Sequence, residues 1–139
     1  MKQILCVFAI AAVAAAAGAC SDNAFTPSVD NVAGDYSVLQ LVTSADTGST
    51  DWVAAGTTWS MTLHPNGVTT GHLFIPDGNG PGIDVDADMA GLWVLSGDTL
   101  RIDQTADTFV RDMTYLASEN RLTGDRIFGT IRVRVVLGK

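Results

Sequence analysis

The stretch that decides the fold is Thr57-Thr-Trp-Ser-Met-Thr-Leu63, which runs into His64-Pro-Asn-Gly67 and then into residues 68–75. Trp59, Met61 and Leu63 alternate with hydroxyl-bearing residues, and this two-residue period is typical of a strand with one buried face. The next four residues predict a turn, because Pro65 fixes its own φ and Gly67 accepts a positive φ. Residues 57–75 are therefore predicted to form a β-hairpin.

The same alternation recurs on both sides of this hairpin. One strand is predicted before it, over residues 36–42, and others follow it over residues 89–95, 99–104, 108–117, 121–126 and 127–137. Residues 43–56 and 76–88 are rich in Gly, Asp, Ser and Thr, which predicts loops. About eight short strands in hairpin order, with no helix, indicate an all-β sandwich or barrel. We expect a small antiparallel up-and-down β-barrel over residues 33–139, because closure removes the exposed edge strands.

Three segments of this predicted barrel resemble the bacterial lipocalin-like, or calycin-type, domains. Ala33-Gly34-Asp35-Tyr36-Ser37-Val38-Leu39 is similar to the Gly-x-Trp opening of that family, with Tyr36 where Trp is usual. Residues 59–67 and 91–100 are similar to its repeated hairpins, and Arg132 or Arg134 matches the family arginine that packs across the opening aromatic residue. The resemblance covers residues 33–137 and implies an envelope module that binds a small apolar molecule.

The first twenty residues have the layout of a bacterial export signal. Met1-Lys2 is a short basic start, residues 4–17 are uninterruptedly apolar, and small residues precede Cys20. The apolar run is shorter than the about 20 residues that are needed to span a membrane. The layout therefore predicts a signal peptide over residues 1–19. Gly18-Ala19-Cys20 also resembles a lipobox, so we expect lipidation of Cys20, a flexible tether over residues 20–32 and an anchor in the cell envelope. Ordinary cleavage after Ala17-x-Ala19, giving a periplasmic or secreted protein, is the alternative.

Composition excludes several classes of function. The chain of 139 residues carries 8 Lys+Arg against 15 Asp+Glu, for a net charge of -7, which argues against binding to nucleic acid. Its two cysteines lie in the predicted signal peptide and at the predicted lipidation site, so no disulfide is expected. The chain has no Gly-x-Ser-x-Gly motif and a single glutamate. We therefore expect a protein that is not an enzyme and needs no cofactor. We also expect it to be a monomer.

Aromatic residues are the main candidates for ligand contacts. Trp59, Phe74 and Trp93 lie on predicted strands, and Trp52 lies in the first long loop. If the barrel is hollow, these side chains are expected to contact a small apolar ligand near the loop end. If they fill the interior instead, the chain is a structural or protein-interaction module without a ligand.

The second long loop contains the residues with the clearest metal-binding chemistry. Asp77, Asn79, Asp84 and Asp88 lie among several glycines, and oxygen ligands on a flexible loop are what Ca²⁺ requires. The alternative is a solvated acidic loop at the mouth of the barrel. The only histidines, His64 and His72, lack the further ligands that a zinc site needs.

Overall fold

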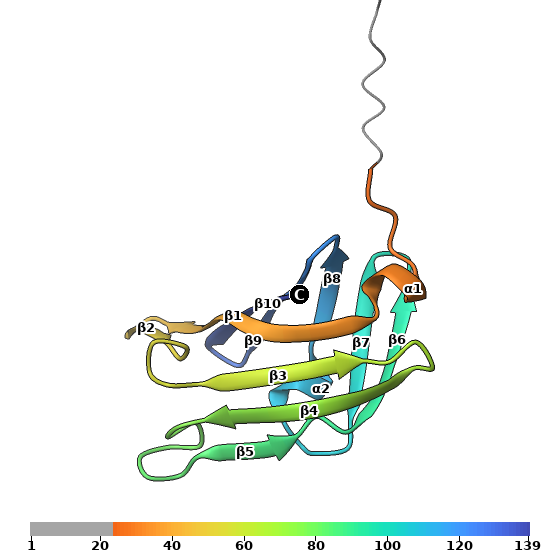
Figure 1. Ribbon diagram of the computed structural model, residues 1–139. Coiled ribbons are helices and arrows are strands. Elements are labelled where there is room, and N and C mark those ends of the chain that lie inside the picture. Colours follow the sequence, from red (N-terminus) through yellow and green to blue (C-terminus); the bar gives the residue numbers. More distant parts are fainter. Residues whose placement is uncertain (1–23) are drawn as a thin grey trace, which may run out of the picture.

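The computed structural model describes residues 24–139, so the predicted signal peptide and the predicted lipidation site at Cys20 lie outside the described residues. The described part contains two short helices and ten strands (Figure 1). In chain order they are α1 (Val29–Val32), β1 (Gly34–Ala45), β2 (Gly48–Asp51), β3 (Thr58–Leu63), β4 (Val68–Ile75), β5 (Val85–Asp88), β6 (Gly91–Ser96), β7 (Thr99–Gln104), α2 (Phe109–Asp112), β8 (Thr114–Ser118), β9 (Arg121–Phe128) and β10 (Ile131–Gly138).

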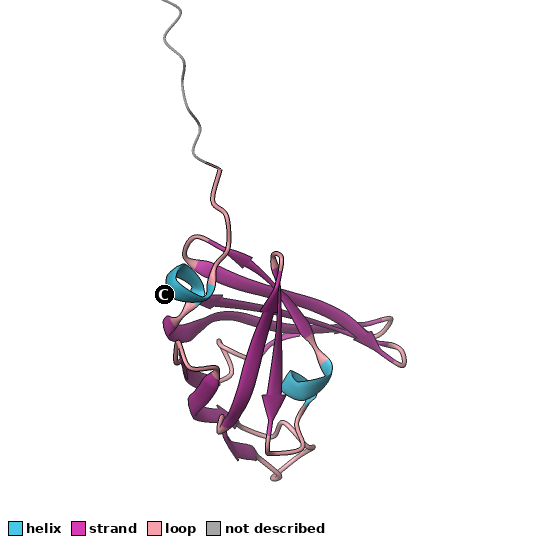
Figure 2. Ribbon diagram, turned by 90° about the vertical axis from the view of Figure 1, so that its right-hand side faces the viewer, coloured by secondary structure: helices cyan, strands magenta, loops and turns pink. Residues whose placement is uncertain are grey.

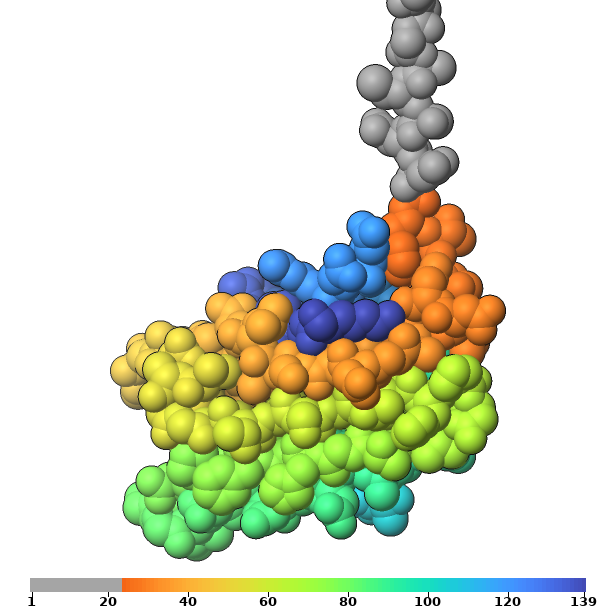
Figure 3. Space-filling view, viewed as in Figure 1, coloured from red at the N-terminus to blue at the C-terminus, as the bar shows by residue number. Residues whose placement is uncertain are grey.

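Eight of the strands close into an antiparallel barrel, which confirms the predicted fold class. The strands follow the order β1-β3-β4-β6-β7-β8-β9-β10, and β10 pairs back with β1 from Ser37↔Gly138 to Ser44↔Arg132. The two extra strands lengthen the wall on one side: β2 pairs with the end of β1, and β5 pairs with the end of β4. In Figure 1, β1, β3 and β4 run across the view, whereas β6, β7 and β8 stand nearly upright behind them. In the space-filling view from the same side, β1, β3 and β4 form neighbouring layers of one continuous surface (Figure 3).

Residues 57–75 form the predicted hairpin, and β3 has the predicted faces. Trp59, Met61 and Leu63 are buried, while Thr58 and Ser60 face outward. At Gly71 of β4, φ is +133° and an added Cβ would lie 2.1 Å from the Ser60 carbonyl oxygen of β3. Only glycine fits this position without displacing the backbone of β3.

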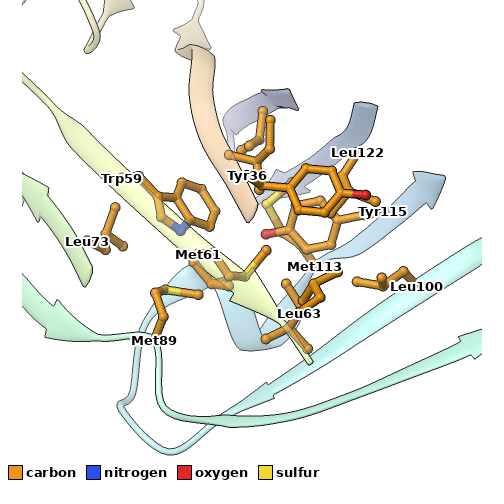
Figure 4. Close-up of a cluster of buried hydrophobic side chains, with 14 of the residues drawn as sticks. Tyr36, Trp59, Met61, Leu63, Leu73, Met89, Leu100, Met113, Tyr115 and Leu122 are labelled. Atoms are coloured by element: carbon orange, nitrogen blue, oxygen red, sulfur yellow. The ribbon is translucent and has the colours of Figure 1, made fainter. Parts of the chain in front are cut away.

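The interior is filled by large side chains (Figure 4). Tyr36, Tyr115, Met61 and Leu100 are each at most 2% exposed, and the Tyr36 hydroxyl donates a hydrogen bond to the Val32 carbonyl at 2.7 Å. Any space for a ligand must lie toward one end.

The predicted tether needs correction over its last residues. Residues 29–32 form α1, and a capping box joins the Ser28 and Asn31 side chains to each other's backbone N–H groups. Val32 is fully buried, Phe25 packs against the core, and Lys139 Nζ bonds the Asn31 carbonyl at 2.6 Å. This segment covers one end of the barrel beside the C terminus (Figure 2).

Three other predicted boundaries are also wrong. Residues 108–113 are not part of a strand, because Thr108 caps α2 and Val110 and Met113 are buried at helical spacing. The predicted loop 43–56 contains the end of β1 and all of β2, and the predicted loop 76–88 contains β5. No helix within residues 24–139 is long and apolar enough to cross a membrane.

Candidate functional site

A pocket of about 480 Å³ opens at the end of the barrel away from α1. Its walls come from the second half of β1, the end of β9, the start of β10, the β4–β5 hairpin, the loop that contains Trp52, and α2 with the residues just before it. The lining residues are Leu41, Thr43, Trp52, Ile75, Gly78, Asn79, Val85, Asp107, Thr108, Phe109, Asp112, Phe128, Ile131 and Val133. This site is the mouth pocket of the barrel.

The mouth pocket exists because the wall divides at β4. The start of β4 pairs with β6 through Val68 and Thr69, whereas its end pairs with β5 from His72 to Ile75. The β4–β5 hairpin therefore continues past the point where β6 turns away. The Thr69 hydroxyl fixes this divergence by donating a 2.6 Å hydrogen bond to the Met89 carbonyl inside the protein.

The floor of the pocket is apolar and rigidly held. Leu41, Ile75 and Val133 are at most 7% exposed and belong to three different barrel strands. Phe109 meets the ring of buried Trp59 edge-to-face, with the ring centroids 6.0 Å apart. Apolar side chains on strands give a ligand a preformed surface, so little conformational entropy is lost on binding.

Trp52 forms one side of the pocket. Its indole N–H donates to the Thr43 hydroxyl at 2.9 Å, and its backbone N–H donates to the Leu41 carbonyl at 2.9 Å. These two bonds fasten the loop to β1. Trp52 is half-buried, so it combines a fixed position with an accessible surface.

Helix α2 positions the opposite side through a chain of hydrogen bonds. Gln104, which is 2% exposed, donates to the Asp88 carbonyl at 2.6 Å and accepts a hydrogen bond from the Thr108 hydroxyl. Thr108 in turn caps the helix that carries Phe109. The orientation of Phe109 is thus tied to both β5 and β7.

The four predicted ligand contacts do not come together. Trp52 lines the mouth pocket, and Trp59 lies beside it in the core, where it supports Phe109. Trp93 lies at the β3–β4 turn instead, with its indole N–H bonded to the His64 carbonyl at 2.8 Å. Phe74 was expected to point inward, but Leu73 and Ile75 take the inner positions, so Phe74 lies on the outer face of β4.

Sequence reasoning missed most of the lining because it chose aromatic residues by type. Leu41, Ile75 and Val133 occupy inward positions near strand ends, a property that depends on barrel closure. Phe109 was assigned to a strand, although Thr108 ahead of it was an available signal for a helix start.

The predicted calcium ligands do not assemble. The Asp77 carboxylate accepts a hydrogen bond from the Gly82 backbone N–H, and the Asp84 carboxylate accepts one from the Asp77 backbone N–H at 2.8 Å. Asp88 lies apart from this turn, at the end of β5, where its backbone lies opposite His72 of β4 in the sheet. Within residues 24–139 no three His, Cys, Asp or Glu side chains form a group that could hold a metal ion.

The histidines are likewise separate. The His64 ring is 3.0 Å from the Thr70 hydroxyl, and the His72 ring is 2.7 Å from an Asp86 carboxylate oxygen.

The arginines of the last strand face outward. Arg132 and Arg134 both bond the Asp125 carboxylate, at 2.7 and 3.0 Å. The Arg132 side-chain hydrogen bond is the main cause that lowers the pKa of Asp125, although burial opposes it. Neither arginine packs across the opening aromatic residue Tyr36. Lys139 does so instead, with its ammonium 5.5 Å from the ring centroid.

The fold and the pocket together define a closed eight-stranded antiparallel barrel with a cavity at one mouth, an architecture consistent with a lipocalin-like fold. Comparison of the chain with protein-family models and with curated proteins finds no match.

Proposed function

We propose that this chain binds a small apolar molecule in the mouth pocket, without catalysis. The observation that carries the proposal is the pocket itself, whose volume of about 480 Å³ lies within the range of about 300–1,000 Å³ usual for small-molecule sites. Eight of its lining side chains are apolar, and three of these are aromatic. Such a surface gains free energy when an apolar ligand displaces water from it.

The filled core limits the size and depth of the ligand. Trp59, Tyr115 and Met61 occupy the interior of the barrel, so a ligand cannot pass along the barrel axis (Figure 4). The pocket suits a single alkyl chain or a small ring system. The resemblance to lipocalin-like domains supports the same function.

The proposed cellular place is the bacterial envelope, with lipidated Cys20 as a membrane anchor. Residues 24–33 enter the barrel at α1, and β1 then carries the chain from Gly34 to the pocket residues Leu41 and Thr43. Helix α1 and the pocket residues of β1 therefore lie toward opposite ends of this strand. An anchored protein would present its mouth away from the membrane surface.

A pocket-filling variant tests ligand binding. The neutral fluorescent probe N-phenyl-1-naphthylamine is expected to brighten and saturate with the native chain. Val85→Trp, which adds bulk to the pocket wall, is expected to weaken this binding at least ten-fold. Val94→Trp is the control, because Val94 is 65% exposed on the outside of β6. No saturable signal with the native chain, or equal binding by all three proteins, would contradict the proposal and favour a structural or protein-interaction module.

Mass spectrometry of the mature protein tests the anchor. The expected product of bacterial expression begins at Cys20 and carries the mass of a diacylglycerol and an acyl chain, and Cys20→Ser removes that mass. An unmodified N terminus in the native chain would support ordinary secretion instead.

A further inference from the structure

The charged groups of the mouth pocket differ from those expected for a carrier of fatty acids. Its lining contains two carboxylates, Asp107 and Asp112, and no Lys, Arg or His. Asp107 forms an ion pair with Arg111, one turn further along α2. Asp112 makes no side-chain hydrogen bond or ion pair within residues 24–139, so its negative charge is available to a ligand.

The connections around the pocket extend this negative charge. Residues 46–47, 52–57, 76–84, 105–113 and 129–130 join the strands at this end, and Arg111 is their only basic residue. The same connections contain five aspartates, at positions 46, 77, 84, 107 and 112. Charges of one sign around a concave site attract ligands of the opposite sign.

The aromatic residues of the lining provide a second, independent form of cation recognition. Trp52, Phe109 and Phe128 all contribute to the pocket surface, and ring faces attract alkylammonium groups. One of these rings already contacts a cation, because the Arg126 guanidinium lies 5.1 Å from the centroid of Phe128. Arg126 itself is not among the lining residues, so it does not place a positive charge on the pocket surface.

We propose that the mouth pocket selects apolar molecules that carry an ammonium group over those that carry a carboxylate. The alkyl part lies on Leu41, Ile75 and Val133, and the ammonium group lies toward Asp112 at the rim. This inference rests on the proposed function, since it assigns the ligand class of the same pocket. Recognition is non-covalent and uses charge attraction and ring contacts together.

The test compares three ligands with one chain length and different head groups. Isothermal titration calorimetry at low salt, below micelle-forming concentrations, gives Kd for dodecyltrimethylammonium, dodecanoate and neutral dodecanol. The ammonium compound is expected to bind at least about five-fold more tightly than dodecanoate, the size of effect expected for a partly exposed charge contact. The preference is expected to shrink in about 0.5 M salt because of screening.

Matched variants locate the effect. Asp112→Asn is expected to reduce the preference about three- to five-fold, whereas Asp103→Asn, on the outer face of β7, leaves it unchanged. The pocket-filling variant Val85→Trp removes binding of the ammonium compound if that binding is in the pocket. Binding that persists in Val85→Trp would show adsorption to the acidic surface and overturn the inference.

The outcomes separate this inference from the proposed function. Equal or tighter binding of dodecanoate, above all if Arg126→Gln abolishes it, would overturn the inference and leave an apolar-ligand pocket standing. An unchanged preference in Asp112→Asn would also overturn it. Failure of all three ligands, dodecanol included, would overturn the proposed function and the inference together.

Discussion

At the scale of single residues, two buried tyrosines provide opposite tests of the core. The Tyr36 hydroxyl is bonded to the Val32 carbonyl at 2.7 Å, whereas the buried Tyr115 hydroxyl has no partner within the described residues. Tyr36→Phe is therefore expected to lower the free energy of unfolding by about 1 kcal/mol, and Tyr115→Phe to leave it unchanged or raise it by up to about 1 kcal/mol. Urea unfolding of both variants measures the difference, and an equal loss in both would contradict the described packing.

The same two residues predict alkaline sensitivity. Burial raises the pKa of Tyr36 to about 12 and raises that of Tyr115 further. The neutral tyrosines stabilise the fold fully below pH 10, the ordinary pKa of tyrosine. That stability is lost as pH rises from 10 toward 12, because the unfolded chain releases these protons first. Urea unfolding between pH 8 and 11.5 is expected to show this fall, and the double variant Tyr36→Phe/Tyr115→Phe to show a smaller one. Equal slopes would contradict the account.

At the scale of elements, the β3–β4 hairpin depends on one close backbone approach. Gly71 and Gly48 have similar φ angles, +133° and +139°, but only Gly71 has backbone atoms where a Cβ would be placed. Gly48→Ala is expected to cost about 1 kcal/mol of stability from the backbone conformation alone. Gly71→Ala is expected to cost about 2 kcal/mol more because the strands must separate. Equal costs in thermal or urea unfolding would show that the approach is absent.

Sequence patterns predicted the elements whose burial alternates and failed where contacts between distant segments decide the structure. Trp59, Met61 and Leu63 were assigned to the core correctly, because their spacing alone defines a face. Phe74 was assigned by its aromatic character, although its neighbours Leu73 and Ile75 already occupied the inner positions of β4. β5 was missed because Val85 and Ala87 are flanked by aspartates, and only pairing with β4 makes that segment a strand.

At the scale of the whole molecule, closure of the barrel could be predicted, but the location of the pocket could not. Hairpin order and the need to remove strand edges were sufficient for closure. The pocket arises because β4 pairs with two different strands and because α2 projects Phe109 toward Trp59. The change of partner along β4 has no local signal, and the local signal for α2 is the capping residue Thr108. The predicted contacts consequently combined residues from both ends and from the outer surface of the barrel.

The three tryptophans report on the mouth, the core and the far end, and they permit the most direct test of the central claim. Trp52 lines the pocket, Trp59 lies in the core beside it, and Trp93 is bonded to the β3–β4 turn. Their indole N–H signals can be followed by NMR while neutral dodecanol is added. Saturable movement that is largest for Trp52, smaller for Trp59 and absent for Trp93 is the expected result. No movement of Trp52, or movement centred on Trp93, would contradict a binding site at the mouth.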